Sequence, residues 1–348
     1  MFVENLEWVL LEIKLPREIT KTPQAMEVFL SALRIGKDGN ALEKYWKGWR
    51  RAWHSLELVS VNGEIHFFLY TQKGFKNIVE SQMYAQFPDA EITEVDDYAK
   101  VVDLPEFWDD WSMWGAEPTL TGDSVLPIRT YVDYGLDKMQ VKEEFKTDPI
   151  TALIEFLGSL REGEQGWFQI LIKAKDAKDF KTAGETFMKT VMDKYKGEEK
   201  SAFRVMSPAD KNLLEVVEKN ISKLAFDVVI RMMYVSKKDK FDPTRITHFI
   251  NSFTTPFSTG IYNGFKPSNG TSVDYPPFKE YRLKEKKVGM AGAYKARGGF
   301  YYPIFRPAFS LNTEALATIY HFPGGVAQTP SFGRLEAKKG EPPAALPV

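Results

Sequence analysis

The chain has 348 residues, a length that allows two domains, and its 43% hydrophobic and 27% charged residues support a buried core and exclude wholesale disorder. It has no cysteine, which excludes disulfides, thiolate metal sites and cysteine nucleophiles. The 46 basic and 47 acidic residues leave a net charge of -1, so overall charge does not indicate a nucleic-acid partner. No apolar run approaches the roughly 20 residues of a membrane-spanning helix, and residues 1–14 lack the features of a secretory signal.

The first hundred residues predict the order strand, helix, strand, strand, helix, strand. Thr22-Pro23 is typical of a helix start, and Asn62-Gly63 between two strand-like runs is the strongest short signal for a hairpin. The predicted strands are 8–14, 55–61, 64–71 and 90–95, and the predicted helices are 23–36 and 74–87. This βαββαβ order predicts a ferredoxin-like module over residues 1–97.

The same order recurs over residues 125–267. Pro follows a capping residue at Asp148-Pro149 and again at Asp242-Pro243, as it does at the first helix. The predicted strands are 126–134, 167–173, 226–235 and 260–266. Two helical stretches, together at about 177–222, interrupt the central hairpin as an insertion. The sequence therefore predicts an α+β fold of two ferredoxin-like modules, the second with a helical insertion, and the repetition favours an internal duplication.

An acidic, Trp-rich segment at 98–124 is predicted to bridge the two modules. Ten acidic residues against Lys100 alone lie between Asp89 and Glu117. Tryptophans at 108, 111 and 114 would share one side of a helical turn. Trp108, Trp111 and Trp114 are therefore candidates for a partner contact, and the alternative is that they pin the bridging segment onto a domain surface.

The last eighty residues are expected to be irregular. Residues 268–337 are rich in Gly, Pro and aromatic side chains, with one short helix expected at 312–320. Residues 338–348 carry several prolines and resemble an extended linker.

Two basic stretches interleaved with aromatic residues are candidates for contact with nucleic acid or another anionic surface. One lies at 43–51 and the other at 279–297. Their candidate contact residues are Lys44, Lys47, Arg50, Arg51, Lys284, Lys286, Lys287, Lys295 and Arg297. Two alternatives stay open, namely an ordinary solvated surface and pairing with the acidic segment at 89–117.

Recognisable enzyme chemistry is missing from the sequence. No phosphate-binding loop of the form Gly-x-x-x-x-Gly-Lys-Ser/Thr occurs, and the four histidines are scattered, without metal-ligand spacing. No nucleophile has a recognisable base partner. We therefore expect no cofactor, no metal and no catalytic residue in this chain.

Several strings of the chain resemble an uncharacterised bacterial domain that precedes, or is encoded alongside, the ATPase of type IV secretion and conjugative DNA-transfer systems. They are LEIKLPRE at 11–18, KTPQAME at 21–27, GEIHF at 63–67, VESQMYAQFPDAEI at 79–92, LATIYHFP at 316–323, Thr329-Pro330 and EPPAALP at 341–347. The resemblance carries no catalytic residue onto this chain, because the motifs of the motor are absent.

The resemblance implies a non-enzymatic accessory or N-terminal module that acts as a scaffold or adaptor. Its expected partner is a P-loop ATPase, in the same chain or a separate one, with DNA, membrane-anchored components or a second copy as further partners. The expected location is the cytoplasm at the inner face of the membrane, reached through those partners. The alternative function is a stand-alone nucleic-acid-binding module that uses the basic and aromatic stretches.

Overall fold

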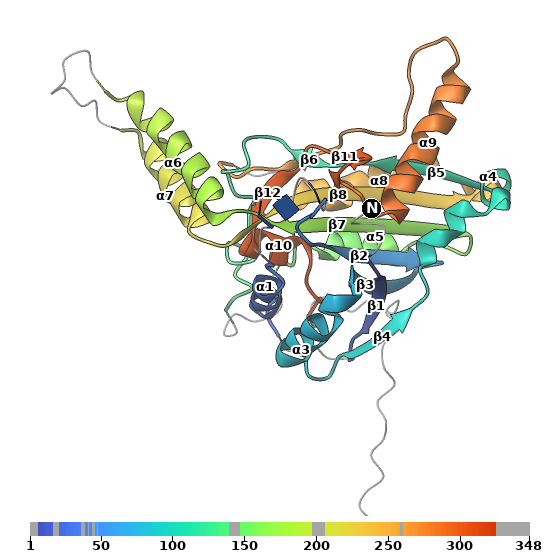
Figure 1. Cartoon of the computed structure of the whole chain (residues 1–348). Coiled ribbons are helices and arrows are strands. Elements are labelled where there is room, and N and C mark those ends of the chain that lie inside the picture. Colours follow the sequence, from blue (N-terminus) through green and yellow to red (C-terminus); the bar gives the residue numbers. More distant parts are fainter. Residues whose placement is uncertain are drawn as a thin grey trace, which may run out of the picture.

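One eight-stranded antiparallel sheet forms the centre of the computed structural model (Figure 1), which describes residues 6–16, 21–35, 39–40, 42–43, 46, 48–138, 147–196, 206–257 and 260–324. The strand order is β12-β8-β7-β2-β3-β1-β4, and β5 pairs with the part of β8 that β12 leaves open. The strands are β1 (Trp8–Lys14), β2 (Trp53–Val61), β3 (Glu64–Gln72), β4 (Glu91–Val95), β5 (Trp111–Ala116), β7 (Glu164–Ala174), β8 (Ala225–Lys237) and β12 (Phe309–Asn312). Two small two-stranded sheets pair β6 (Thr119–Leu120) with β9 (Phe265–Lys266) and β10 (Phe300–Tyr301) with β11 (Ile304–Phe305).

The sheet is continuous across the two predicted modules. Strand β2 pairs with β7 over nine residue pairs, from Trp53 opposite Lys173 to Val61 opposite Gln165. The hairpin between β2 and β3 turns at Asn62-Gly63 as predicted, with both residues at positive φ. A Cβ at Gly63 would lie 2.5 Å from the carbonyl oxygen of Leu160, so only glycine fits this turn.

The large helix-covered core lies on one face of the sheet. Five helices supply it, together with the apolar side chains of one face of the sheet. They are α1 (Pro23–Ala32), α3 (Lys76–Gln86), α5 (Thr151–Gly158), α8 (Pro243–Thr254) and α10 (Thr313–Ile319). The helix starts predicted from Pro23 and Pro243 are confirmed, with a non-helical residue before each Pro.

The opposite face is covered by fewer elements. A second apolar cluster includes Val59, Trp167 and Met233 of the sheet. Above it lie the 3-10 segment η2 (Tyr98–Asp103), α4 (Pro105–Asp110) and the C-terminal half of α9 (Lys279–Lys295).

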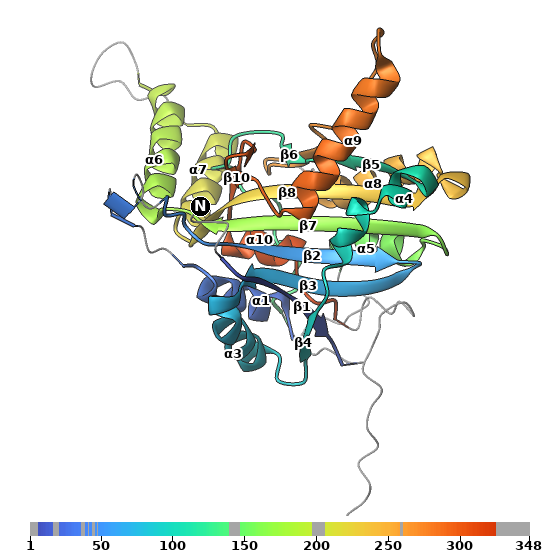
Figure 2. The same cartoon turned by 45° about the vertical axis from the view of Figure 1, so that its right-hand side comes forward.

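Two helical arms stand away from the sheet (Figure 1; Figure 2). One is the predicted insertion, which forms the pair α6 (Ala177–Asp193) and α7 (Pro208–Ile221). These two helices pack on each other through a small cluster that also includes Val125 and Ala225, and Gly184 lets Ile221 approach closely. The other arm is α9, whose buried side chains begin only at Met290.

The strand predicted at 126–134 is wrong. Residues Tyr131–Asp137 form turns, and Ile128 makes only an isolated bridge with Asn263. The Asp133 carboxylate accepts a hydrogen bond from the backbone N–H of Thr130 at 2.8 Å, a local bond that competes with strand pairing. Strand β5 takes a place beside β8 instead, and only Phe265–Lys266 of the predicted 260–266 strand pairs, with β6.

The irregular conformation expected for 268–337 is wrong for Lys279–Lys295, which form the 17-residue helix α9. Helix α9 buries side chains only near its C-terminal end, namely Met290, Ala291, Ala293 and Tyr294. It therefore lacks an apolar face along its length, which is the pattern that identifies a helix in a sequence. The predicted linker at 338–348 lies outside the described residues.

Two histidines are part of the packing. His54 in β2 is buried, its Nδ1 atom lies 2.9 Å from Thr71 Oγ1, and burial lowers its pKa to about 4. His321 is also buried, and its Nε2 atom lies 3.1 Å from the carboxylate of Asp148.

The pKa of His54 predicts a pH-dependent stability. Between pH 6.5 and 4 the unfolded chain binds a proton at His54 that the folded chain excludes, so the free energy of unfolding falls as pH falls, by up to about 1.4 kcal/mol per pH unit. Replacing His54→Asn removes this contribution, so urea unfolding of the variant should depend less on pH over that range. Replacing the exposed His248→Asn serves as the control and should leave the wild-type slope unchanged. Equal slopes for wild type and His54→Asn would contradict the assignment.

Candidate functional site

Five basic side chains from three segments gather at one end of the sheet. We call this cluster the basic corner, and its members are Arg34, Arg50, Arg51, Lys173 and Lys175. Arg34 Nη2 donates to the carbonyl oxygen of Lys175 at 2.8 Å, and Arg51 Nη1 donates to that of Ala174 at 2.6 Å. These two bonds join the segment after α1 and the segment before β2 to the end of β7.

Aromatic rings lie beside these cations. The Arg50 guanidinium is 5.0 Å from the ring centroid of Tyr301, and Lys173 Nζ is 4.8 Å from that of Phe300. The Tyr301 hydroxyl donates to the carbonyl oxygen of Arg51 at 3.1 Å, which holds the β10-β11 hairpin against the basic corner. Cation–ring contacts of this kind hold both groups in fixed orientations.

One carboxylate belongs to the same cluster. Asp227 of β8 lies 3.2 Å from Lys173 Nζ and 3.0 Å from Lys175 Nζ. Asp227 pairs with two of the five basic side chains, which leaves the cluster positively charged. Positive charge beside aromatic faces is the combination that binds phosphates and stacks bases.

Two of the five residues of the basic corner were predicted from the sequence. Arg50 and Arg51 belong to the predicted stretch at 43–51, whereas Lys44 and Lys47 lie outside the described residues. Arg34, Lys173 and Lys175 were missed because they fall outside the two predicted basic stretches. The pairing of β2 with β7, which sets Trp53 opposite Lys173, brings Lys173 and Lys175 to Arg50 and Arg51, and Arg34 joins them through its bond to Lys175.

The second predicted basic stretch is divided by the fold. Lys284 is exposed on α9, and Lys286 Nζ donates to the carbonyl oxygen of Ser272 at 3.0 Å. Lys287 is half-buried, and burial lowers its pKa. Lys295 Nζ donates to the carboxylate of Asp103 at 2.7 Å. Arg297 is fully buried, so it is not part of an exposed contact surface.

The burial of Arg297 has a clear electrostatic reason. Its guanidinium donates to both carboxylate oxygens of Glu57, at 2.9 and 3.0 Å, and to Asp97 at 2.9 Å. Burial alone would raise the pKa of Glu57, but the charge and hydrogen bonds of Arg297 hold it below its ordinary value. We call Arg297, Glu57 and Asp97 the buried ion network.

A polar row extends this network across the sheet. Glu57, Gln169 and Arg231 are opposite one another on β2, β7 and β8. Gln169 Nε2 donates to Glu57 at 3.0 Å, and its Oε1 accepts from Arg231 at 3.1 Å. Arg231 also pairs with Glu117 at 2.8 Å. The row therefore links the end of α9 to three central strands.

Two acidic residues of the predicted 89–117 stretch pair with the basic stretch at 279–297, since Asp97 binds Arg297 and Asp103 binds Lys295. Glu94 binds Lys76 and Glu117 binds Arg231, which lie outside the two predicted basic stretches. The intramolecular pairing considered as an alternative in the sequence therefore occurs for this part of the chain. The basic corner, where Arg50 is exposed, and the outer half of α9 lie outside this pairing.

The three tryptophans do not share one helical turn. Helix α4 ends at Asp110, and Trp111 begins β5, whose pairing with β8 replaces the expected helix. Trp108 Nε1 donates to the carbonyl oxygen of Val102 at 3.2 Å, and Phe107 packs against both Trp108 and Trp111. Trp114 packs on the helix-covered core at the other face. All three are half-buried, which favours their role in pinning the segment.

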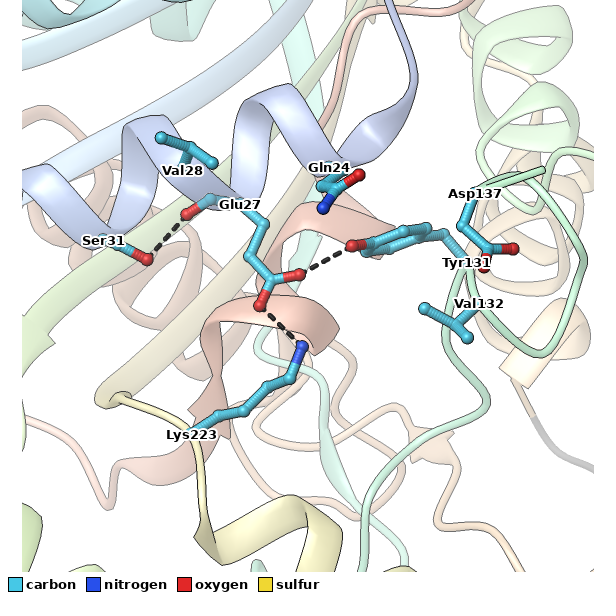
Figure 3. Close-up of a pocket in the computed structure, with 8 residues that line it drawn as sticks. All are labelled: Gln24, Glu27, Val28, Ser31, Tyr131, Val132, Asp137 and Lys223. Atoms are coloured by element: carbon cyan, nitrogen blue, oxygen red, sulfur yellow. Dashed lines mark hydrogen bonds and ion pairs between the residues drawn. The ribbon is translucent and has the colours of Figure 1, made fainter. Parts of the chain in front are cut away.

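A pocket of about 410 Å³ lies between α1 and the turn near residue 131 (Figure 3). Glu27 accepts hydrogen bonds from the Tyr131 hydroxyl at 2.6 Å and from Lys223 Nζ at 2.7 Å. Burial alone would lower the pKa of Lys223, but its bonds to Glu27 and Glu314 raise it. The two carboxylates and the lysine neutralise much of one another, so this cluster mainly joins α1, the end of α7 and α10.

Within the described ranges, no three His, Asp or Glu side chains are grouped so that they could hold a metal ion. Over the same part of the chain, no helix has both the length and the apolar composition needed to cross a bilayer.

These features define the class of the protein as mixed α+β, with a large antiparallel sheet and a basic corner at one end of it. The family described as Domain of unknown function (DUF8128) matches residues 4–331. The match covers most of the chain, and the chain belongs to this family. No curated protein matches the sequence.

The buried ion network predicts a large effect of one substitution. Replacing Arg297→Met leaves the Glu57 and Asp97 charges without their partner and should lower the free energy of unfolding by about 3–5 kcal/mol in urea denaturation. The double variant Arg297→Met with Glu57→Gln should recover part of this loss, because one buried charge is removed. Lys284→Met on the exposed part of α9 is the control, and a loss at Arg297→Met no larger than the control's would contradict the role of the network.

Proposed function

We propose that this chain is a non-enzymatic module of a type IV secretion- or conjugation-type DNA-transfer system. In this proposal it accompanies the P-loop ATPase, as its N-terminal part or as a separate protein, and acts as a scaffold or adaptor. It works on the cytoplasmic side of the membrane, where its partners hold it. The strings that resemble the ATPase-associated domain support this, because those at 11–18, 21–27 and 79–92 overlap β1, α1 and α3.

The observation that carries the proposal is the helical arm α6-α7. It is inserted between β7 and β8, which pair directly with each other and need no helices between them to complete the sheet. The arm stands off the body (Figure 1), with a small cluster at its base, and Met192 on α6 is 43% exposed. An inserted arm on a large sheet suits a protein that positions a partner.

A finer proposal concerns the origin of the sheet. We propose that it consists of two ferredoxin-like modules joined at strands β2 and β7. The order β2-β3-β1-β4, with α1 and α3 on one face, supports the first module. In the second module, β5 and β6 replace the strand predicted at 126–134. The pairing of β7 with β8, of β8 with β5 and of β6 with β9 gives an order similar to that of the first module.

The adaptor proposal predicts binding to the motor. The chain, added to the purified P-loop ATPase of its own transfer system, should bind it in isothermal titration calorimetry and change its rate of ATP hydrolysis. Replacing Met192→Glu on α6 should weaken binding about tenfold, because it buries a charge at a contact. Val288→Glu on α9 is the matched control, since Val288 is similarly exposed at 42%. A motor that neither binds the chain nor changes its hydrolysis rate would overturn the proposal.

A second candidate function is favoured by the basic corner, namely direct nucleic-acid binding. The exposed Arg50 guanidinium beside the ring of Tyr301 would neutralise a phosphate next to a ring face. This candidate is compatible with the adaptor function but does not need a motor.

The basic corner predicts salt-dependent DNA binding. Fluorescence anisotropy with labelled single- and double-stranded DNA should show a log affinity that falls linearly with log salt concentration. Arg50→Glu should weaken binding and reduce the salt slope by about 1, because one phosphate contact is lost. Lys181→Glu, on the exposed face of α6, should leave affinity nearly unchanged. If Arg50→Glu keeps the wild-type affinity and slope, the basic corner does not bind DNA.

A further inference from the structure

Helix α9 begins in a protruding group of aromatic and basic side chains, at the end that stands away from the sheet (Figure 2). We call this group the α9 tip, and its members are Tyr275, Phe278, Lys279, Tyr281, Arg282 and Lys284. Phe278 is 75% exposed, Tyr281 67% and Tyr275 61%. Exposed aromatic side chains gathered within seven residues are uncommon on a water-facing surface and indicate a contact site.

The backbone at the α9 tip adds a second observation. Phe278 caps the start of α9 with a φ of 60°, a left-handed conformation that a bulky side chain rarely adopts. Such a conformation is unfavourable for a bulky residue, and structures retain it mainly where neighbouring contacts compensate or where function needs it. The Phe278 ring is exposed, so it gains little from packing within the chain.

The charges at the α9 tip complement an anionic surface. Lys279 and Arg282 are three residues apart on α9 and therefore lie on the same side of the helix. The Arg282 guanidinium is 4.9 Å from the ring centroid of Tyr275. Glu280 is the acidic residue among these positions, so the α9 tip is positive overall.

The shape of the arm distinguishes between two anionic partners. Helix α9 is anchored at its C-terminal end by the buried ion network and stands away from the body, so the tip is convex and distant from the sheet (Figure 2). Proteins that bind single-stranded nucleic acid use a groove that follows the backbone. A soft bilayer can instead surround a protruding tip, with aromatic rings at headgroup depth and basic groups beside phosphates.

We propose that the α9 tip inserts into the interface of an anionic lipid bilayer. Phe278 and Tyr281 enter the headgroup region, while Lys279, Arg282 and Lys284 contact lipid phosphates. This contact is made by the chain itself and needs neither the motor nor DNA. It therefore goes beyond the adaptor function and can fail or succeed independently of it.

The test is sedimentation of the full chain with vesicles, one set of phosphatidylcholine alone and one with 30% phosphatidylglycerol. We expect binding to the anionic vesicles at least tenfold stronger than to the neutral ones, and weaker binding at high salt. The aromatic variant Phe278→Ser/Tyr281→Ser and the charge variant Lys279→Gln/Arg282→Gln/Lys284→Gln should each reduce anionic-vesicle binding about tenfold or more.

The matched control is Tyr302→Ser, because Tyr302 is 89% exposed but belongs to the turn of the β10-β11 hairpin. It should bind anionic vesicles as the wild type does. Circular dichroism and the unfolding midpoint verify that each variant is folded. Equal sedimentation with both vesicle sets, or full binding by the α9 tip variants, would overturn the proposal. If the variants instead lose affinity for DNA while no vesicle binding occurs, the α9 tip is a nucleic-acid contact.

Discussion

On the face of the sheet that carries η2, α4 and α9, the arrangement of these elements depends on the ion pair between Arg297 and Glu57. Both side chains are fully buried, and moving two charges out of water is favourable only when their hydrogen bonds are nearly complete. Arg297 meets this condition through Glu57, Asp97 and the carbonyl oxygen of Lys295. Because Glu57 lies in β2, at the middle of the sheet, the pair fixes where α9 ends and the following hairpin begins.

This constraint has consequences in two directions. Before Arg297, helix α9 leads away from the sheet and carries the α9 tip to its outer end (Figure 2). After Arg297, the β10-β11 hairpin returns to the sheet and places Tyr301 against Arg50. One buried pair therefore positions both the basic corner and the α9 tip. Between them, Asp103 neutralises Lys295 and Asp97 neutralises part of the charge of Arg297. A chain with a net charge of -1 can in this way present two positive surfaces.

The elements predicted correctly have strong local signals. Asn62-Gly63 determines its hairpin through backbone conformation alone, and Pro243 marks the start of α8 by its fixed φ. The errors occur where local signals are weak or compete. Residues 126–134 carry apolar side chains but turn because Asp133 binds the backbone of Thr130. Helix α9 was missed because it has no continuous apolar face. Trp111 and Trp114 lie in a strand, and not in the expected helix, because β5 pairs with the part of β8 that β12 leaves unpaired.

The sequence by itself determined the mixed α+β class, most strands and helices, the inserted helical pair and the lack of a recognisable P-loop or cysteine site. These depend on turn residues, capping residues and side-chain periodicity, which act over a few neighbouring residues. The tertiary structure alone decided that β2 pairs with β7, that Arg297 is buried and that Arg34 and Lys175 join Arg50 and Arg51. Such outcomes depend on pairing between segments more than a hundred residues apart, where burial and charge neutralisation outweigh local preference.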